Sequence, residues 1–144
     1  EATESIPEIS RMVLFRAGEE RPFTGTTVNG FTFDCGEEGL YVSPISGAKL
    51  FTSKAKFDTG NGRMSFWAPV GADSIVERID PRDKKGVPPP FWRVEVLDRA
   101  SMTHLGHVFE DGPDPTGKRY DINAAALRFV PGAAPEGDKA QASA

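Results

Sequence analysis

The stretch HLGHVFEDGPDPTGKRY, residues 104–120, is the part of the chain that decides the fold. It holds one run rich in aromatic and β-branched residues, HVFE at 107–110, and opens a second, RYDIN at 119–123. Such runs are typical of β-strands. The residues between them are rich in Gly, Pro and Asp, which favour a turn. The stretch therefore predicts two strands separated by a turn.

The same β pattern extends in both directions along the chain. Short aromatic and β-branched runs alternate with Gly, Asn, Asp and Pro, and together they predict strands. The other runs are FTF (31–33), LYVSPI (40–45), KLFTS (49–53), SFWAPV (65–70), SIVERI (74–79), FWRVEVL (91–97) and ALRFV (126–130). Only the start of the chain has helical signals, with Pro7 and Glu8 at a helix start and an apolar face at Met12, Val13 and Phe15. We expect a mainly β fold with a short N-terminal helical element.

One run and one loop carry more detailed expectations. In FWRVEVL, Trp92, Val94 and Val96 share one side and are the better core candidates, which leaves Glu95 on the other side. The segment DKKGVPPP at 83–90 is expected to be an exposed loop whose Pro run favours polyproline II.

Composition limits the range of partners. The chain has 144 residues, 38% of them hydrophobic, and a net charge of −4, values typical of one ordinary globular domain. No basic stripe is present, which argues against nucleic acid, and no apolar run approaches the roughly 20 residues that span a bilayer. Cys35 is the only cysteine, so the chain has no internal disulfide. If Glu1 is a processed N-terminus, we expect an extracytoplasmic location such as the periplasm.

The C-terminal tail GAAPEGDKAQASA, residues 132–144, has no hydrophobic side chain larger than Ala. By composition this tail should not order by itself. We therefore expect it to be held by another protein subunit.

Several segments, read together, resemble the B-type methionine sulfoxide reductases. The matching segments are ERPFTG (20–25), YVSPISGAKLFTSKAKFDTGNG (41–62), SFWAPV (65–70), RVEV (93–96), HLGHVFEDGPDPTGKRY (104–120), IN (122–123) and ALRFVP (126–131). The resemblance implies two antiparallel sheets packed as a β-sandwich or tent. It also implies a domain at 19–131, between an N-terminal extension at 1–18 and the tail at 132–144.

The resemblance also implies which residues should carry the chemistry. In this family a low-pKa thiolate attacks the sulfoxide sulfur and becomes a sulfenic acid, which a second thiol resolves. The nucleophile lies in a segment that reads Arg-Tyr-Cys-Ile-Asn, and here Asp121 stands in its place. Asn61 likewise stands where a resolving cysteine often lies. Arg63 replaces a Trp that forms an apolar wall for the substrate's S-methyl group.

The resemblance also bears on the zinc-binding CxxC motifs and on Cys35. Some members bind zinc through a pair of CxxC motifs, whose positions are here Ser43 and Ser46, then Asp98 and Ser101. Cys35 lies outside the catalytic motif, beside acidic residues that disfavour a thiolate. We expect Cys35 to be incidental.

What the resemblance leaves is a polar remnant pocket, listed as His104, His107, Phe109, Arg119, Asp121, Asn123 and Phe66. Positions i and i+3 of a flat strand face opposite sides, so His104 and His107 converge only if Gly106 permits a bulge. Two interpretations of the pocket stay open. Asp121 accepts hydrogen bonds from a His or from Arg119 as an ion-paired remnant, or it joins His104 and His107 in a facial triad for Fe(II) or another divalent metal.

The leading hypothesis is a catalytically inactive reductase-like domain, without a cofactor, that serves as a structural or binding subunit of a larger assembly. The first alternative is a metal-binding protein or metalloenzyme that uses the two His and Asp121. The second is recognition of oxidised-methionine peptides without turnover.

Overall fold

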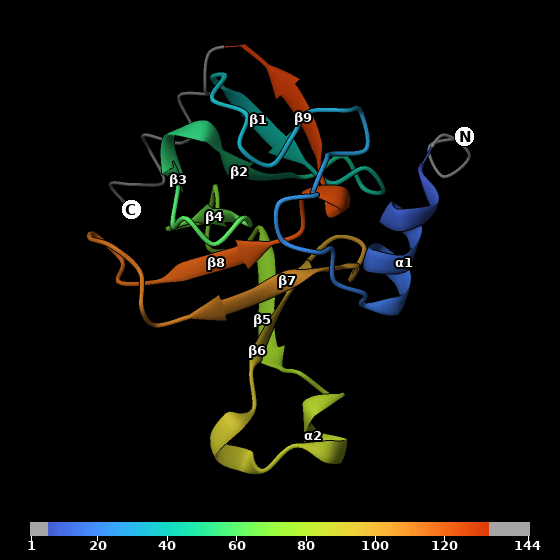
Figure 1. Ribbon diagram of the computed structural model, residues 1–144, viewed down its shortest axis with the longest axis vertical. Helices are drawn as coiled ribbons and strands as arrows, with labels where there is room; N and C mark the ends of the chain where they lie inside the picture. The colour runs from blue at the N-terminus through green and yellow to red at the C-terminus, as the bar shows by residue number, and fades with distance from the viewer. Residues whose placement is uncertain (1–5, 133–144) are drawn as a thin grey trace.

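A computed structural model describes residues 6–132 of the chain. Its first sheet has three antiparallel strands, with β1 (Gly39–Val42) between β2 (Lys49–Thr52) and β9 (Arg128–Pro131). This sheet therefore joins an early hairpin to the last strand of the fold (Figure 1).

The second sheet has six antiparallel strands in the order β3-β4-β8-β7-β6-β5. Their bounds are β3 Lys56–Phe57, β4 Met64–Phe66, β5 Ile75–Ile79, β6 Val94–Asp98, β7 His104–Phe109 and β8 Arg119–Ile122. The expected mainly β fold with two antiparallel sheets and one short N-terminal helix is confirmed. The two strands predicted from residues 104–120 pair with each other at the centre of this sheet.

The core between the sheets is built from aromatic side chains. Phe51 stacks on Phe66 with ring centroids 4.4 Å apart, and Tyr41 lies 4.7 Å from Phe129. All four rings are fully buried. Because β1, β2, β4 and β9 each contribute one ring, burial of these side chains holds the two sheets together.

The helix α1 (Glu8–Arg16) covers one side of the fold and ends at Ala17, which adopts a left-handed conformation. Ser10, Val13 and Leu14 are its buried residues, and the helix packs on β7 and on the 3-10 helix η4 (Ala124–Ala126). The expected apolar face is therefore only partly right. Val13 enters the core, whereas Met12 and Phe15 are exposed.

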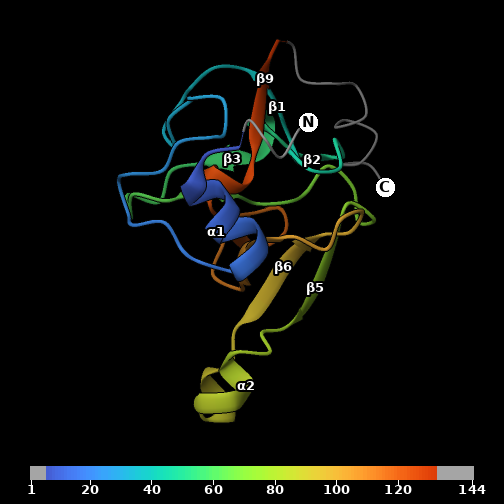
Figure 2. The ribbon, with the colours of Figure 1, turned by 90° about the vertical axis from the view of Figure 1, so that its right-hand side faces the viewer.

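Three local expectations are wrong. Residues 31–33 form no strand, and only an isolated bridge joins Thr26 to Thr32. The segment 83–90 contains a short helix, α2 (Asp83–Gly86), and the start of the 3-10 helix η3 (Pro89–Phe91), at the tip of the long β5–β6 hairpin (Figures 1 and 2). Glu95, expected on an outer side, is buried because β6 is covered on both faces near its centre.

The remaining short element is the 3-10 helix η2 (Ser53–Ala55), which connects β2 to β3. The expectation that a partner holds the tail falls on residues that, beyond Gly132, lie outside the described part of the chain. Within residues 6–132 no helix has the length and apolar character needed to cross a membrane.

Candidate functional site

A β-bulge in β7 brings the two histidines to the same face of the sheet. Val96 pairs with Gly106 and Leu97 pairs with His104, so Leu105 is an extra residue in the register. The two imidazole rings consequently lie 5.5 Å apart between centroids. Gly106 has no room for a side chain, because a Cβ there would collide with the backbone oxygen of Asp121. The bulge that is needed for the two histidines to converge is therefore present.

The strand register places a row of polar residues across this face. Glu95 pairs with His107, His107 pairs with Asp121, and Asp121 pairs with Ser65. Directly opposed residues point to the same side of a sheet. The face that holds Asp121 is therefore polar, whereas its neighbour Tyr120 points to the core side of β8.

Asp121 is held between two arginines. Arg63 Nε donates to Asp121 Oδ1 over 2.6 Å, and Arg119 Nη1 donates to Oδ2 over 3.3 Å. The side chains of Arg63 and Asp121 are only 10% and 17% exposed. Arg63 Nη1 also donates to the backbone oxygen of Glu20 over 2.8 Å, which fixes the guanidinium in place. The carboxylate is thus paired: the expected hydrogen bond from Arg119 is present, and Arg63 is a closer partner that was not expected.

Arg119 has its main partners elsewhere. Its guanidinium makes two hydrogen bonds to Asp111, of 2.9 and 3.2 Å, and lies 4.5 Å from the ring centroid of Phe109. Asp111 and the ring hold Arg119 against the edge of the site, and these contacts raise the pKa of Arg119. Phe109, Arg119 and Asp121 are therefore brought together as expected from the sequence.

The two histidines belong to a separate network of carboxylates. His104 Nδ1 lies 2.7 Å from Glu95 Oε2, and His107 Nε2 lies 2.8 Å from Asp80 Oδ2. Burial lowers the pKa of His104 in spite of its carboxylate partner. Burial raises the pKa of Glu95, but hydrogen bonds from His104 and Arg78 outweigh it and leave the pKa lowered.

This geometry bears on the divalent-metal interpretation. Asp121 points its two oxygens at arginines, and His107 faces Asp80 with one ring nitrogen and Glu19 with the other, at 2.8 and 3.5 Å. On this face, Nε2 of His104 and Oγ of Ser65 are buried without a hydrogen-bond partner. Among residues 6–132 no group of three or more His, Cys, Asp or Glu side chains is arranged to hold a metal ion.

Two other members of the expected pocket have structural positions. Phe66 pairs with Tyr120, not with Asp121, and its ring is fully buried against Phe51, so it belongs to the core. Asn123 is fully buried, accepts a hydrogen bond from the backbone N–H of Glu20 and donates to the backbone oxygen of Leu105. Asn123 therefore anchors the chain beneath the site.

The four positions of the family's CxxC pair also come together. Asp98 is fully buried, and its Oδ2 accepts hydrogen bonds from Ser46 Oγ over 2.7 Å and from Ser101 Oγ over 2.6 Å. Ser43 Oγ accepts from the backbone N–H groups of Ile45 and Ser46. Because residue 46 lies in the β1–β2 turn and residue 98 ends β6, this cluster ties the two sheets together.

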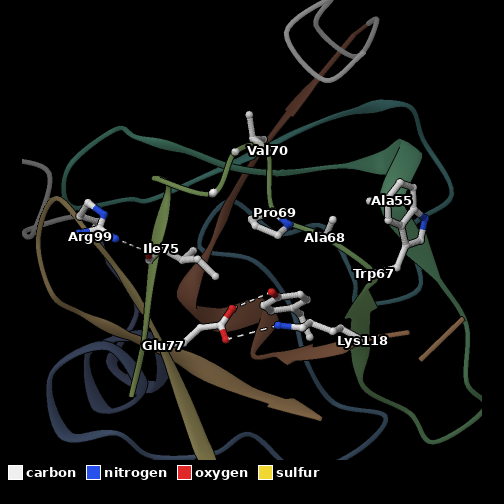
Figure 3. A pocket seen from close by; sticks show the side chains of 12 residues that line it. Ala55, Trp67, Ala68, Pro69, Val70, Ile75, Glu77, Arg99 and Lys118 are labelled. Carbon is white, nitrogen blue, oxygen red and sulfur yellow. Dashed lines mark hydrogen bonds and ion pairs between the residues drawn. The ribbon is translucent and has the colours of Figure 1, made fainter. Parts of the chain in front are cut away.

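Two hollows are present besides the polar face, one away from Asp121 and one beside its partner Arg63. A cleft of about 470 Å³ opens on the core side of the six-stranded sheet, lined by Trp67, Ile75 and Tyr120 among others (Figure 3). Its charged groups are already paired, since the Tyr120 hydroxyl donates to Glu77 and Lys118 lies 3.9 Å from the same carboxylate. Cys35 lines a smaller hollow of about 270 Å³, where Lys56 donates to its backbone oxygen.

Comparison with known proteins agrees with this architecture. The family model for the SelR domain matches residues 6–131. A "Peptide methionine sulfoxide reductase MsrB" from Hahella chejuensis is 46% identical over 112 residues, which cover 78% of this chain and 73% of that protein. A "Peptide methionine sulfoxide reductase MsrA/MsrB" from Vibrio cholerae is 43% identical over 119 residues, 83% of this chain and 29% of that protein. The chain therefore belongs to the SelR domain family, alongside proteins named as methionine sulfoxide reductases of the MsrB type.

Proposed function

We propose that this chain keeps the MsrB-like domain without the thiol-based reductase activity, and that it serves as a structural or binding subunit of a larger assembly. The observation that carries the proposal is the 2.6 Å ion pair between Arg63 and Asp121, at the position where the family's nucleophile would lie. Both relatives are named as reductases, so the proposed inactivity rests on the residues of this chain and not on its family.

The chemistry of residue 121 supports inactivity. Reduction of a sulfoxide by this route needs a thiolate that attacks sulfur and is itself oxidised to a sulfenic acid. A carboxylate has no sulfur to oxidise, and both oxygens of Asp121 are already bound by guanidinium groups. Cys35, the only thiol in the chain, lines a hollow that includes Arg63 but not Asp121.

Arg63 also makes the wall that would face the substrate's methyl group charged instead of apolar. Its guanidinium is largely buried and is held by Asp121 and by the backbone oxygen of Glu20. A desolvated charge makes a poor surface for a methyl group, because apolar pockets bind such groups by excluding polar atoms. The pair therefore fills the site with mutually satisfied charges, which favours a structural role.

Turnover of a peptide containing methionine-R-sulfoxide, with dithiothreitol as reductant, tests the inactivity. We expect no turnover above background from the natural chain and weak turnover at most from Asp121→Cys. Adding Arg63→Trp should raise the rate more than tenfold, because an aromatic wall contributes upwards of about 1.4 kcal/mol to transition-state binding. The Hahella chejuensis relative is the positive control, and turnover by the natural chain at a comparable rate would contradict the proposal.

Calorimetry with the same peptide separates an inactive domain that recognises oxidised methionine from one that does not bind it. We expect no saturable heat, since Arg63 and Asp121 are paired with each other. Purification from the native source tests the assembly role separately. Recovery of the chain with stoichiometric partner subunits supports it, and recovery free of any partner subunit contradicts it.

A further inference from the structure

The helix α1 is apolar on two sides. Its inner side buries Val13 and Leu14, which are 0% and 2% exposed. Its outer side presents Ile9, Met12 and Phe15, which are 47%, 47% and 54% exposed, at a spacing of three residues. A helix that is apolar on both sides is typical of one that is covered on both sides.

The position of α1 leaves its outer side open. The helix lies at one edge of the molecule in Figure 1 and in front of the sheets in Figure 2, and among residues 6–132 no other helix or strand lies outside it. Residues three apart lie on the same helical face. Ile9, Met12 and Phe15 therefore form an apolar stripe on the described surface, and the exposed charges of Glu8, Arg11 and Arg16 flank it.

The residues around this patch are arranged symmetrically about Met12. Ile9 and Phe15 lie three residues to either side of it, and Glu8 and Arg16 lie four residues to either side. Glu8 is in the first turn and Arg16 in the last turn, and both are exposed. Two such helices packed antiparallel bring Met12 against Met12, Ile9 level with Phe15, and Glu8 level with Arg16.

We propose that α1 is a self-association surface, on which the α1 helix of a second copy of this chain packs antiparallel about a two-fold axis beside Met12. An interface of this kind is self-complementary, since the same patch serves both subunits. The charges favour a second copy over an unrelated apolar segment, because the acidic end of one helix meets the basic end of the other. The antiparallel arrangement also pairs opposite ends of the helix dipoles.

The small size of the patch limits the affinity of the expected dimer. One nine-residue helix offers three large apolar side chains, so the contact is smaller than the roughly 1,200 Å² typical of stable interfaces. We expect a weak, concentration-dependent dimer with a Kd on the order of 10–100 µM. Its dissociation should be governed by the apolar stripe, and its orientation by the charged ends.

Analytical ultracentrifugation of the full chain, from about 5 to about 500 µM, tests the proposal. The weight-average mass should rise from 15.6 kDa toward twice that value. Met12→Glu should weaken association at least tenfold, and Phe91→Glu, an exposed apolar position at the distant hairpin tip, should leave it unchanged. If Met12→Glu fails to fold, Ile9→Glu serves the same purpose.

Charge exchange tests the antiparallel arrangement. Glu8→Arg and Arg16→Glu should each weaken association about threefold to tenfold by opposing like charges. The double variant should recover the natural affinity, because it exchanges both ends of each pair. A mass that stays at one chain up to the highest concentration, association that persists in Met12→Glu, or a double variant as weak as the single ones would overturn the proposal. A monomer at all concentrations would leave the stripe to a different partner, without bearing on the reductase test.

Discussion

Asp121 and Asp98 occupy two positions where the family resemblance places cysteines, and the fold treats the two carboxylates differently. Asp121 is 17% exposed and is neutralised by the charges of Arg63 and Arg119. Asp98 is fully buried and receives neutral donors, the hydroxyls of Ser46 and Ser101 and the backbone N–H of Ala100.

The difference shows two ways to accommodate a carboxylate in place of sulfur. At Asp121 long cationic side chains reach the carboxylate, one from its own strand β8 and one from the residue before β4, and leave it near the surface. At Asp98 short donors from two turns enclose the carboxylate and thereby join the two sheets. A charge buried among neutral donors depends on each of them, because an unsatisfied group in the interior is costly. We therefore expect Asp98 to matter more for stability than Asp121.

The largest effect is expected at Asp98. Asp98→Ala removes the acceptor of three hydrogen bonds and leaves the Ser46 and Ser101 hydroxyls without their partner. The free energy of unfolding should fall by about 3 kcal/mol, since bonds to a charged acceptor contribute about 1.5–3 kcal/mol each and are not additive. Urea unfolding followed by fluorescence measures the change.

Asp73→Ala is the matched control for Asp98→Ala, because Asp73 is exposed and close in space to the same end of β6 through Arg99. We expect it to change stability by less than about 0.5 kcal/mol. Equal losses in the two variants would mean that the Ser46–Asp98–Ser101 cluster does not tie the sheets together.

A smaller effect is expected at the other carboxylate. Asp121→Asn should lower the free energy of unfolding by about 1–2 kcal/mol, because it leaves the largely buried Arg63 without its charged partner. Arg63→Leu together with Asp121→Asn should cost less than the sum of the two single changes, since the double variant leaves no unpaired charge. A double-mutant cycle measures this coupling, and strict additivity would show that the 2.6 Å pair contributes nothing.

The smallest effect at neutral pH is expected at Asp83, a buried carboxylate whose partner Arg93 is 39% exposed. Hydrogen bonds from Arg93 lower the pKa of Asp83 to about 2. Its contribution is therefore present above about pH 4, the pKa of an unfolded Asp, and is lost as the pH falls toward 2. Asp83→Asn should cost about 0.5–1 kcal/mol at pH 7.

Thermal unfolding between about pH 7 and about pH 2 measures the acid dependence of that contribution. The natural chain should lose stability more steeply than Asp83→Asn below about pH 4. Parallel curves for the two proteins would show that Asp83 binds its proton at the same pH in the folded and unfolded chain.

Much of the fold could be predicted from residue patterns, because strand runs and turn residues act locally. The run LYVSPI overlaps β1, and the run RYDIN contains β8, as expected. The failures come from contacts that are distant in sequence. Glu95 alternates like a surface residue, yet it is buried because His104, Arg78 and Arg82 supply its donors. The residues of α2 lacked a helical pattern long enough to be recognised.

The site was less accessible to sequence reasoning. His104 and His107 share a face because of the bulge in β7. The sequence indicates only that Gly106 must permit such a bulge if the two histidines are to converge. The family resemblance identifies Arg63 only as the residue that replaces the Trp of the methyl pocket, although Arg63 is the nearest partner of Asp121. Its position two residues before Ser65, which pairs with Asp121, was the available signal, since diagonal neighbours on paired strands can touch. The partners Asp80 and Glu19 had no such signal.

The steric requirement for glycine at position 106 does not depend on the side chain of residue 121. The space that this glycine leaves empty is taken by the backbone oxygen of residue 121, an atom that every amino acid possesses. Selection against any side chain at position 106 therefore acts identically whether residue 121 carries sulfur or oxygen. A change of side chain at position 121 therefore leaves the steric requirement at position 106 unaltered.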